Sequence, residues 1–345
     1  KTYATPLDAF EDGADVTIGG VAYNKAGLID GKGLTLTHIT ADSADKAIGA
    51  DGVYFIDGNI DVTMTTPSGA SFKQLVVICN TPGQRVNVTA TVQLTLTQIN
   101  AEDTGNAAFK GVNLDFSGFS NYAVVQNSNL AFGNLLFEDC RIQTCTGKPL
   151  TYISMSTRSF DNIVFDSCEY YFANTSSQSL IISLGTSTAT YNNLTVRNCV
   201  FFTDENKTAS KFRIVQGSAS TFRNVTIENN TFANLVTDTS FYLYVGTMET
   251  VVVKNNIFWT DKALPNNMGL LRAAVNWPTA KTVKDNLSYC PAGDSSWQIA
   301  YGGLANLFEG AENVIAAASD PLASKDYVNG VFVPTSEYSA YGASR

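Results

Sequence analysis

One phrase recurs through the middle of the chain and constrains its fold more than any other feature. Five copies begin at residues 132, 160, 191, 222 and 248, which are 28, 31, 31 and 26 residues apart, and a shorter copy spans residues 282–287. A period in this range is typical of solenoids, in which each unit stacks on the one before it. No copy has the spacing of an amphipathic helix, so the sequence predicts a solenoid built from strands.

Apolar and polar residues alternate inside each copy, as in Val225 and Ile227. Period-two alternation indicates a strand with one buried face. Two small or amide residues follow, such as Asn229 and Asn230, and asparagine tolerates the left-handed backbone of a tight bend. An apolar residue such as Phe232 then resumes the pattern. Each copy therefore predicts a strand, a bend and a second strand, which is the plan of a parallel β-helix.

The second residue of each bend forms a predicted column inside the solenoid, because equivalent residues of successive coils stack about 4.8 Å apart. Stacked amides can donate and accept hydrogen bonds along such a column. The cysteines in it are expected to be buried free thiols, since parallel side chains give poor disulfide geometry. The members of the column are Cys140, Cys168, Cys199, Asn230, Asn256 and Asn286.

The phrase Val-x-Ile-x-Asn-Asn-x-Phe resembles the coils of the pectin-lyase-like superfamily, and the resemblance covers residues 109–290. It implies an all-β fold, a single-stranded right-handed parallel β-helix. Exposed ends of a solenoid pair with other chains unless they are covered, so we expect a cap at each end. The expected organisation is an N-terminal cap with early coils in residues 1–108, regular coils in 109–299 and a C-terminal capping segment in 300–345.

A second resemblance lies in the C-terminal sequence, in Asp320-Pro321, Asp326-Tyr327 and Ala340-Tyr-Gly-Ala343. These residues resemble the closing segment of β-helix proteins that gut Bacteroidetes export, often as surface lipoproteins encoded beside polysaccharide-utilisation machinery. The resemblance implies an exported protein of the outer membrane, cell surface or periplasm that handles a glycan. Membrane attachment would come only from a lipid anchor preceding Lys1. The superfamily includes lyases, hydrolases, esterases and binding proteins, so the fold leaves the function open.

Composition argues against several kinds of partner. The formal net charge is −9, so the basic footprint of a nucleic-acid-binding protein is absent. The six cysteines show no CxxC spacing and His38 is the single histidine, so no zinc site is expected. The glycine- and aspartate-rich repeat that binds calcium in other β-rolls is also missing. We therefore expect no metal and no cofactor, with Ca²⁺ required only if the protein is a lyase.

A strip of aromatic and cationic residues is the predicted carbohydrate-binding site, because sugars bind to aromatic faces and planar hydrogen-bond donors. Alternation puts Tyr242 and Tyr244 on one face of their strand. One coil earlier Arg213 would lie near Tyr242, and Arg272 is a candidate neighbour one coil later. The simpler interpretation is that the tyrosines pack under a loop and the cations only solvate the surface. The predicted strip comprises Lys211, Arg213, Tyr242, Tyr244 and Arg272.

A charged column offers the alternative, a polysaccharide lyase that acts by β-elimination on an acidic glycan. Arg197 would lie between Asp166 and Glu228 as a base flanked by carboxylates that hold a metal or the substrate. A surface ladder of ion pairs explains the same column more simply. The column reads Glu138, Asp166, Arg197, Glu228, Lys254 and Lys284.

The function expected from the sequence is therefore an exported or cell-surface β-helix that binds a polysaccharide or oligosaccharide, with catalysis unproven. The alternatives are the lyase and a structural or adhesive rod. A recurring aromatic column that includes Tyr171, Phe202 and Trp259 is expected to be packing rather than a ligand platform.

Overall fold

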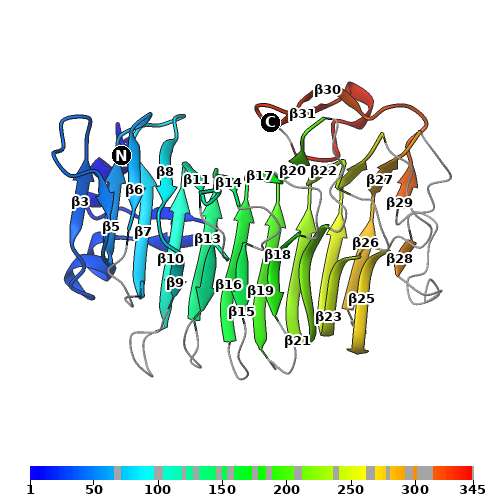
Figure 1. Ribbon diagram of the computed structural model, residues 1–345, viewed down its shortest axis with the longest axis horizontal. Helices are drawn as coiled ribbons and strands as arrows, with labels where there is room; N and C mark the ends of the chain where they lie inside the picture. Colours follow the sequence, from blue (N-terminus) through cyan, green and yellow to red (C-terminus); the bar gives the residue numbers. More distant parts are fainter. Residues whose placement is uncertain are drawn as a thin grey trace.

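The protein is an all-β parallel β-helix with almost no helix, as Figure 1 shows for the computed structural model. No helix among the described residues has the length and hydrophobicity needed to span a membrane. The structure describes residues 1–65, 71–96, 104–118, 122–126, 132–144, 150–153, 159–172, 178–183, 189–205, 212–235, 241–261, 269–276, 280–291, 298–300 and 314–343.

Three faces of parallel strands enclose one core, and we name them A, B and C. Face A begins with β3 (Leu36–Ile39), β5 (Gly52–Ile56), β7 (Gln74–Cys79), β10 (Gly105–Lys110) and β13 (Phe132–Glu138). It continues through β16 (Ser159–Asp166), β19 (Thr190–Arg197), the second parts of β21 (Phe212–Glu228) and β23 (Phe241–Lys254), and β26 (Ala280–Lys284).

Face B is a separate sheet of 11 strands. These are β4 (Ala47–Ile48), β6 (Asp61–Met64), β8 (Val86–Ala90), β11 (Val112–Asp115), β14 (Arg141–Gln143), β17 (Glu169–Phe172), β20 (Val200–Thr203), β22 (Thr231–Ala233), β24 (Ile257–Trp259), β27 (Asn286–Tyr289) and β29 (Val314–Ala316). Face C comprises β9 (Leu94–Leu96), β12 (Val124–Gln126), β15 (Thr151–Ile153), β18 (Gln178–Ser183), the first parts of β21 and β23, β25 (Gly269–Asn276) and β28 (Gln298–Ala300). The long strands β21 and β23 pass from face C into face A and join these two faces into one sheet.

A left-handed residue marks each predicted bend between faces A and B. Its φ lies between 50° and 55° at Asp139, Ser167, Asn198, Asn229, Asn255 and Asp285. Asparagine and aspartate adopt this conformation more readily than most residues with a side chain, which is why the repeat places them there. The predicted strand, bend and strand of each copy are thus confirmed.

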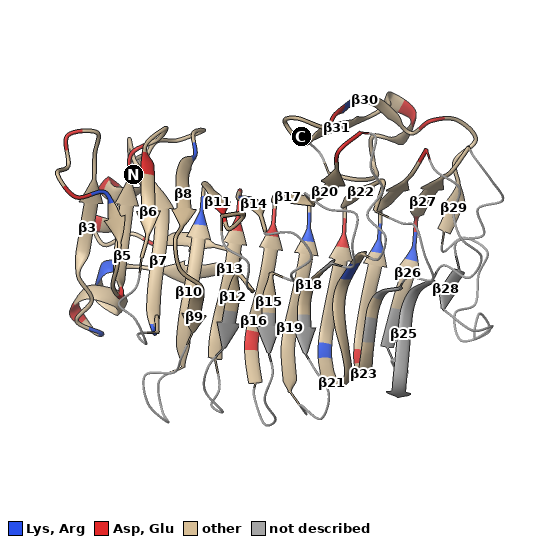
Figure 2. Ribbon diagram, in the orientation of Figure 1, with Lys and Arg blue, Asp and Glu red and all other residues tan. Residues whose placement is uncertain are grey.

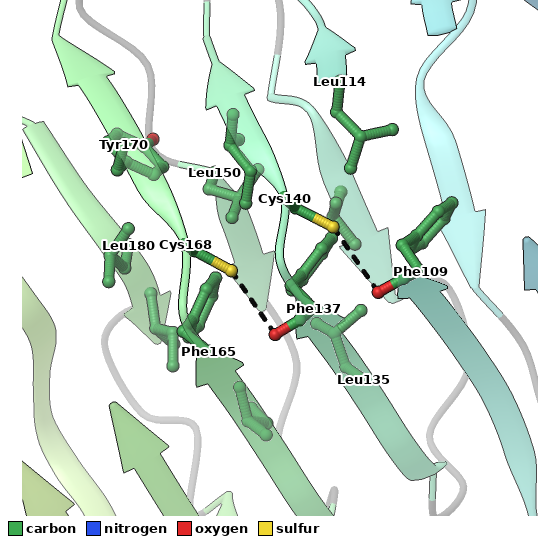
Figure 3. Packing of buried hydrophobic residues seen from close by; sticks show 14 of the residues in the cluster. Phe109, Leu114, Leu135, Phe137, Cys140, Leu150, Phe165, Cys168, Tyr170 and Leu180 are labelled. Atoms are coloured by element: carbon green, nitrogen blue, oxygen red, sulfur yellow. Dashed lines mark hydrogen bonds between the residues drawn. The ribbon is translucent and has the colours of Figure 1, made fainter. Parts of the chain in front are cut away.

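The next residue of each bend points into the core and forms the predicted inner column. Asn256 is fully buried, and its Nδ2 donates to Asn286 Oδ1 at 2.8 Å while its Oδ1 accepts from Asn230 Nδ2 at 2.9 Å. The cysteines continue the column as free thiols. Figure 3 shows Cys140 and Cys168 donating to backbone carbonyl oxygens of face A, each at 3.4 Å. The column satisfies polar groups where water cannot reach, as predicted.

The N-terminal arm, residues 1–34, lies across the outside of face A (Figure 1). It contains α1 (Pro6–Glu11), β1 (Val16–Ile18), β2 (Val21–Tyr23) and the short π-helical turn η1 (Ala26–Asp30). Its buried Phe10 and Ile18 pack on outward apolar residues of face A as far along as Val164. Gly19 packs closely there, since a Cβ at this position would lie 3.2 Å from that valine. The arm therefore covers the first half of face A.

The C-terminal segment, residues 314–343, leaves face B after β29 and folds back along its outer surface (Figure 1). The hairpin of β30 (Leu322–Asp326) and β31 (Val331–Pro334) buries Leu322 and Phe332 against face B residues that include Phe202 and Trp259. The aromatic column predicted to be packing is thus buried at these two rings. The described part of the predicted C-terminal cap covers a side of the solenoid, because the outer residues of face B are apolar there.

Candidate functional site

The charged column runs along face A in register, with the coils aligned as predicted. Asp166 lies opposite Arg197, and Arg197 opposite Glu228. Figure 2 shows these charges at the ends of the face A strands. The column begins one coil earlier than predicted, at Lys110, which lies opposite Glu138.

Three adjacent pairs in the column are ion pairs. Arg197 Nη2 lies 2.6 Å from Asp166 Oδ2, Lys110 Nζ lies 2.7 Å from Glu138 Oε1, and Lys254 Nζ lies 3.0 Å from Glu228 Oε2. Each pair of opposite charges on neighbouring strands stabilises a sheet by roughly 0.2–1 kcal/mol. This geometry is the surface ladder that the sequence offered as the simpler explanation.

Arg197 is held in its charged form. Its hydrogen bond to Asp166 is the main reason that the pKa of this guanidinium is raised above its already high ordinary value. A catalytic base has to release its proton near the working pH, and this pairing acts in the opposite direction. The assignment of Arg197 as base, with Asp166 and Glu228 as ligands, stays a prediction.

A second column runs along face C and contains two members of the predicted strip. Strand register places Gln216 opposite Tyr244, and Tyr244 opposite Arg272. Gln216 is half-buried, whereas Val215 and Leu243 in the adjacent inner column are fully buried. The face C column reads Thr95, Val125, Tyr152, Ile182, Gln216, Tyr244 and Arg272.

Of the other members of the predicted strip, the structure describes the position of the Arg213 side chain. Arg213 is half-buried and lies opposite Ser179 of the preceding coil. Because Val215 lies opposite Leu243, extending the register by two residues brings Arg213 opposite position 241, one residue before its predicted neighbour Tyr242. Lys211 and the side chains of Tyr242, Tyr244 and Arg272 lie outside the described residues.

Sequence reasoning missed a cleft of 360 Å³ on face B, beside the C-terminal segment. Tyr171 Oη donates to Asp204 Oδ1 at 2.5 Å, and desolvation followed by this hydrogen bond raises the pKa of Tyr171 to about 12. Glu205 also lines the cleft, and Tyr327 lines it from the C-terminal segment. A cleft of tyrosines and carboxylates can accept and donate hydrogen bonds to a polar ligand.

Arg141 lines this cleft and contacts both the C-terminal segment and face B. Its Nη2 donates to Val328 O at 2.7 Å, and its guanidinium lies 5.8 Å from the centre of the Phe202 ring. A contact of this kind between a cation and an aromatic face is attractive. Arg141 therefore fastens the hairpin to face B as well as lining the cleft, and the sequence carries no repeated signal for either role.

His38, the single histidine of the chain, pairs with one carboxylate. His38 Nε2 lies 2.9 Å from Asp57 Oδ1. Burial of Asp57 opposes ionisation, but hydrogen bonds from His38 and Asn80 outweigh it, so the pKa of Asp57 is lowered. No group of three or more His, Cys, Asp or Glu residues that could hold a metal ion occurs among the described residues. The need of the lyase alternative for Ca²⁺ stays a prediction.

Comparison with known proteins adds little. No protein-family profile matches the chain, and none of the curated proteins matches it. Among solved structures it is similar to a PL6 family alginate lyase, AlyGC, with 12% sequence identity and a TM-score of 0.24 over 87% of this chain. The match spans 57% of the lyase chain. At this identity and TM-score, nothing about the activity of that enzyme transfers to this protein.

Proposed function

We propose that the protein binds a polysaccharide along face C. The observation that carries the proposal is the column in which Gln216, Tyr244 and Arg272 occupy successive strands. Arg213 lies on the same face and is half-buried. A straight row of residues on parallel strands suits a linear polymer, since each coil can meet the next part of the chain.

The residue types in this column match the chemistry of sugars. Tyrosine offers an apolar ring with a polar tip, and arginine offers a planar fork of donors. The amide of Gln216 both donates and accepts hydrogen bonds, as sugar hydroxyls do. Export to the cell surface, which the resemblance implies, is part of the proposal, because a polymer of this kind is met outside the cell.

The arrangement of the described residues favours binding over cleavage. The one column with the charges of a lyase is joined into ion pairs on face A, and its arginine is stabilised in the protonated form. The face C column contains one arginine, two tyrosines and no carboxylate. Those are the components of a recognition surface.

The test is a panel of neutral and acidic polysaccharides read in two ways with the intact chain. Native gels that contain each polysaccharide report binding, and ultraviolet absorbance of unsaturated products, with and without Ca²⁺, reports β-elimination. Retardation without new absorbance is the expected result. Rising absorbance would make the protein a lyase, and no retardation by any polysaccharide would favour the structural rod.

A further inference from the structure

A second candidate ligand site is the cleft of 360 Å³ on face B, beside the C-terminal segment. The described residues that line it are Arg141, Tyr171, Asp204, Glu205, Tyr327 and Val328. Its volume lies near the lower end of the range for ligand pockets, roughly 300–1,000 Å³, so it suits a ligand of the size of one sugar residue. None of these six residues is fully buried, and a molecule in the cleft can therefore reach them.

The apolar part of the cleft is Val328. Its side chain is 77% exposed, more than that of any other large hydrophobic residue that the structure describes. Its backbone is nevertheless held on both sides, since Val328 N donates to Asp326 Oδ1 at 3.0 Å and Val328 O accepts from Arg141 Nη2 at 2.7 Å. Folding thus fixes this valine at the cleft without burying it. An apolar side chain on a fixed backbone can cover the apolar face of a ligand at little cost in conformational entropy.

Tyr327 contributes an aromatic ring and a hydrogen-bond donor. Its ring packs edge-on against Phe332 at a centroid distance of 5.1 Å, which fixes its orientation. Its Oη accepts from Asn234 Nδ2 at 3.4 Å, and no described residue accepts the hydroxyl hydrogen. Desolvation and, after it, nearby carboxylates raise the pKa of the Tyr327 phenol. The hydroxyl therefore keeps its hydrogen at neutral pH and can donate it to a ligand.

Glu205 and Arg141 supply charged groups of opposite sign. Glu205 is exposed, and its carboxylate forms no hydrogen bond or ion pair with a described residue. Arg141 uses Nη2 to bond Val328 O, whereas its Nη1 lies 3.9 Å from Glu169 Oε2, which is too long for a hydrogen bond. The cleft thus offers a strong acceptor and a strong donor that folding leaves available.

These groups favour an uncharged, hydroxylated ligand. An acidic ligand would meet a second carboxylate as well, that of Asp204, which accepts from Tyr171 Oη at 2.5 Å, and like charges in a binding site oppose binding. A cationic ligand would meet the guanidinium of Arg141. A sugar hydroxyl, by contrast, can donate to Glu205 and accept from Tyr327 or Arg141, and hydrogen bonds to charged groups are the stronger ones.

We propose that this cleft binds one neutral sugar residue. Its hydroxyl groups bond to Glu205, Arg141 and Tyr327, and its apolar face packs on Val328. The site lies on face B and shares no residue with the face C column. Binding here can fail while polysaccharide binding on face C persists, and the reverse also holds.

The experiment is calorimetric titration of the full chain with three neutral sugars, glucose, galactose and mannose, each beside its own uronate. The sugars differ from one another in the direction of single hydroxyl groups, and each uronate differs from its sugar in the carboxylate. We expect at least one neutral sugar to bind and its uronate to bind at least about tenfold more weakly. Absence of binding by all three sugars would overturn the proposal, and so would a uronate that binds as tightly as its sugar.

Glu205→Gln locates the site, because it keeps the shape of the side chain and removes the charge of the acceptor. It should weaken binding of the sugar by about tenfold. Glu337→Gln is the matched control, since Glu337 is an exposed glutamate of the C-terminal segment outside the cleft lining, and it should leave the affinity unchanged. A Glu205→Gln variant with the parent affinity would overturn the proposal.

Val328→Ala tests the apolar contact and should weaken sugar binding at least about threefold. Val333→Ala makes the same change on the same segment outside the cleft lining and should leave the affinity unchanged. Because Glu205 and Val328 are both exposed, the midpoint of thermal unfolding should stay that of the parent in both variants. Arg272→Ala, on face C, should keep the parent affinity for the sugar, and a loss there would place the sugar on face C instead.

Discussion

The outer surfaces of faces A and B differ from that of face C in what covers them. The N-terminal arm packs on outward apolar residues of face A, and the C-terminal segment packs on those of face B. The described residues include no hydrophobic cluster on the outside of face C. Two of the three sides of the solenoid are thus used for stability, and the proposed polysaccharide site lies on the third, face C.

The extent of the N-terminal arm on face A can be compared with the outward residue of each coil. Where the arm packs, the central outward residue of face A is apolar, as at Leu136 and Val164. On the next coils, beyond the arm, the same position holds the half-buried Thr195 and Thr226. Burial of an apolar residue stabilises the fold, and the change from valine to threonine coincides with the end of the arm. The next coil again has a valine at this position, the half-buried Val252.

Removing a ring from the covered side should have the largest effect. Phe332→Ala deletes a fully buried side chain that packs on Phe202 at a ring distance of 5.7 Å. We expect a loss of about 3–5 kcal/mol in the free energy of unfolding, measured by urea denaturation. Val333→Ala is the matched control, since Val333 lies on the other side of β31 and is 37% exposed. Equal losses for the two variants would show that the hairpin does not cover face B.

A smaller effect is expected inside the solenoid, beneath all three faces. Asn256→Ala removes hydrogen bonds to Asn230 and Asn286 in the fully buried column. Leaving those partners unsatisfied should cost about 1–3 kcal/mol. Asn193→Ala removes the hydrogen bond that Asn193 Nδ2 donates to Asn162 Oδ1 at 3.0 Å on the outside of face A. Water can replace the lost partner there, so this substitution should cost less than about 0.5 kcal/mol. Urea denaturation of the pair measures the difference, and similar costs would contradict the assignment of inner and outer columns.

The smallest expected effect is on the free energy of unfolding at alkaline pH, and it comes from Tyr171 beside the C-terminal segment on face B. Tyr171 has a pKa of about 12, whereas an unfolded tyrosine titrates near about 10. The neutral phenol therefore contributes stability that is complete below about pH 10 and is lost as the pH rises toward 12. Tyr171→Phe should reduce the slope of unfolding free energy against pH in this window. A slope unchanged by the substitution would mean that the hydroxyl is not shielded at Asp204.

The repeated parts of the structure could be predicted from the sequence, because each coil restates the same physical requirement. The left-handed bend at Asn229 and the buried bonds of Asn256 follow from residue chemistry that recurs with every coil. The cover on face A was not predicted, although Leu135-Leu136-Phe137 carries a signal for it. Three consecutive apolar residues indicate a strand buried on both sides, and all three are fully buried.

The candidate sites were harder to predict, because they depend on segments that do not repeat. Alternation within strands predicts the face on which Tyr244 and Arg272 lie, whereas their alignment is set by the register of β23 and β25. The exact neighbour of Arg213 depends on the lengths of the connecting loops, which vary from coil to coil. The cleft at Tyr171 requires Tyr327, so this site joins the solenoid to a distant end of the chain.

The most direct test of polysaccharide binding by face C compares single arginines on two faces. Arg272→Ala removes a cation from the face C column, and Arg223→Ala removes one from face A, where its side chain is 55% exposed. Affinity is measured from retardation in native gels that contain a polysaccharide from the panel. It should fall by about tenfold for Arg272→Ala and stay unchanged for Arg223→Ala. Equal retardation of Arg272→Ala and the parent, or a loss confined to Arg223→Ala, would contradict the account.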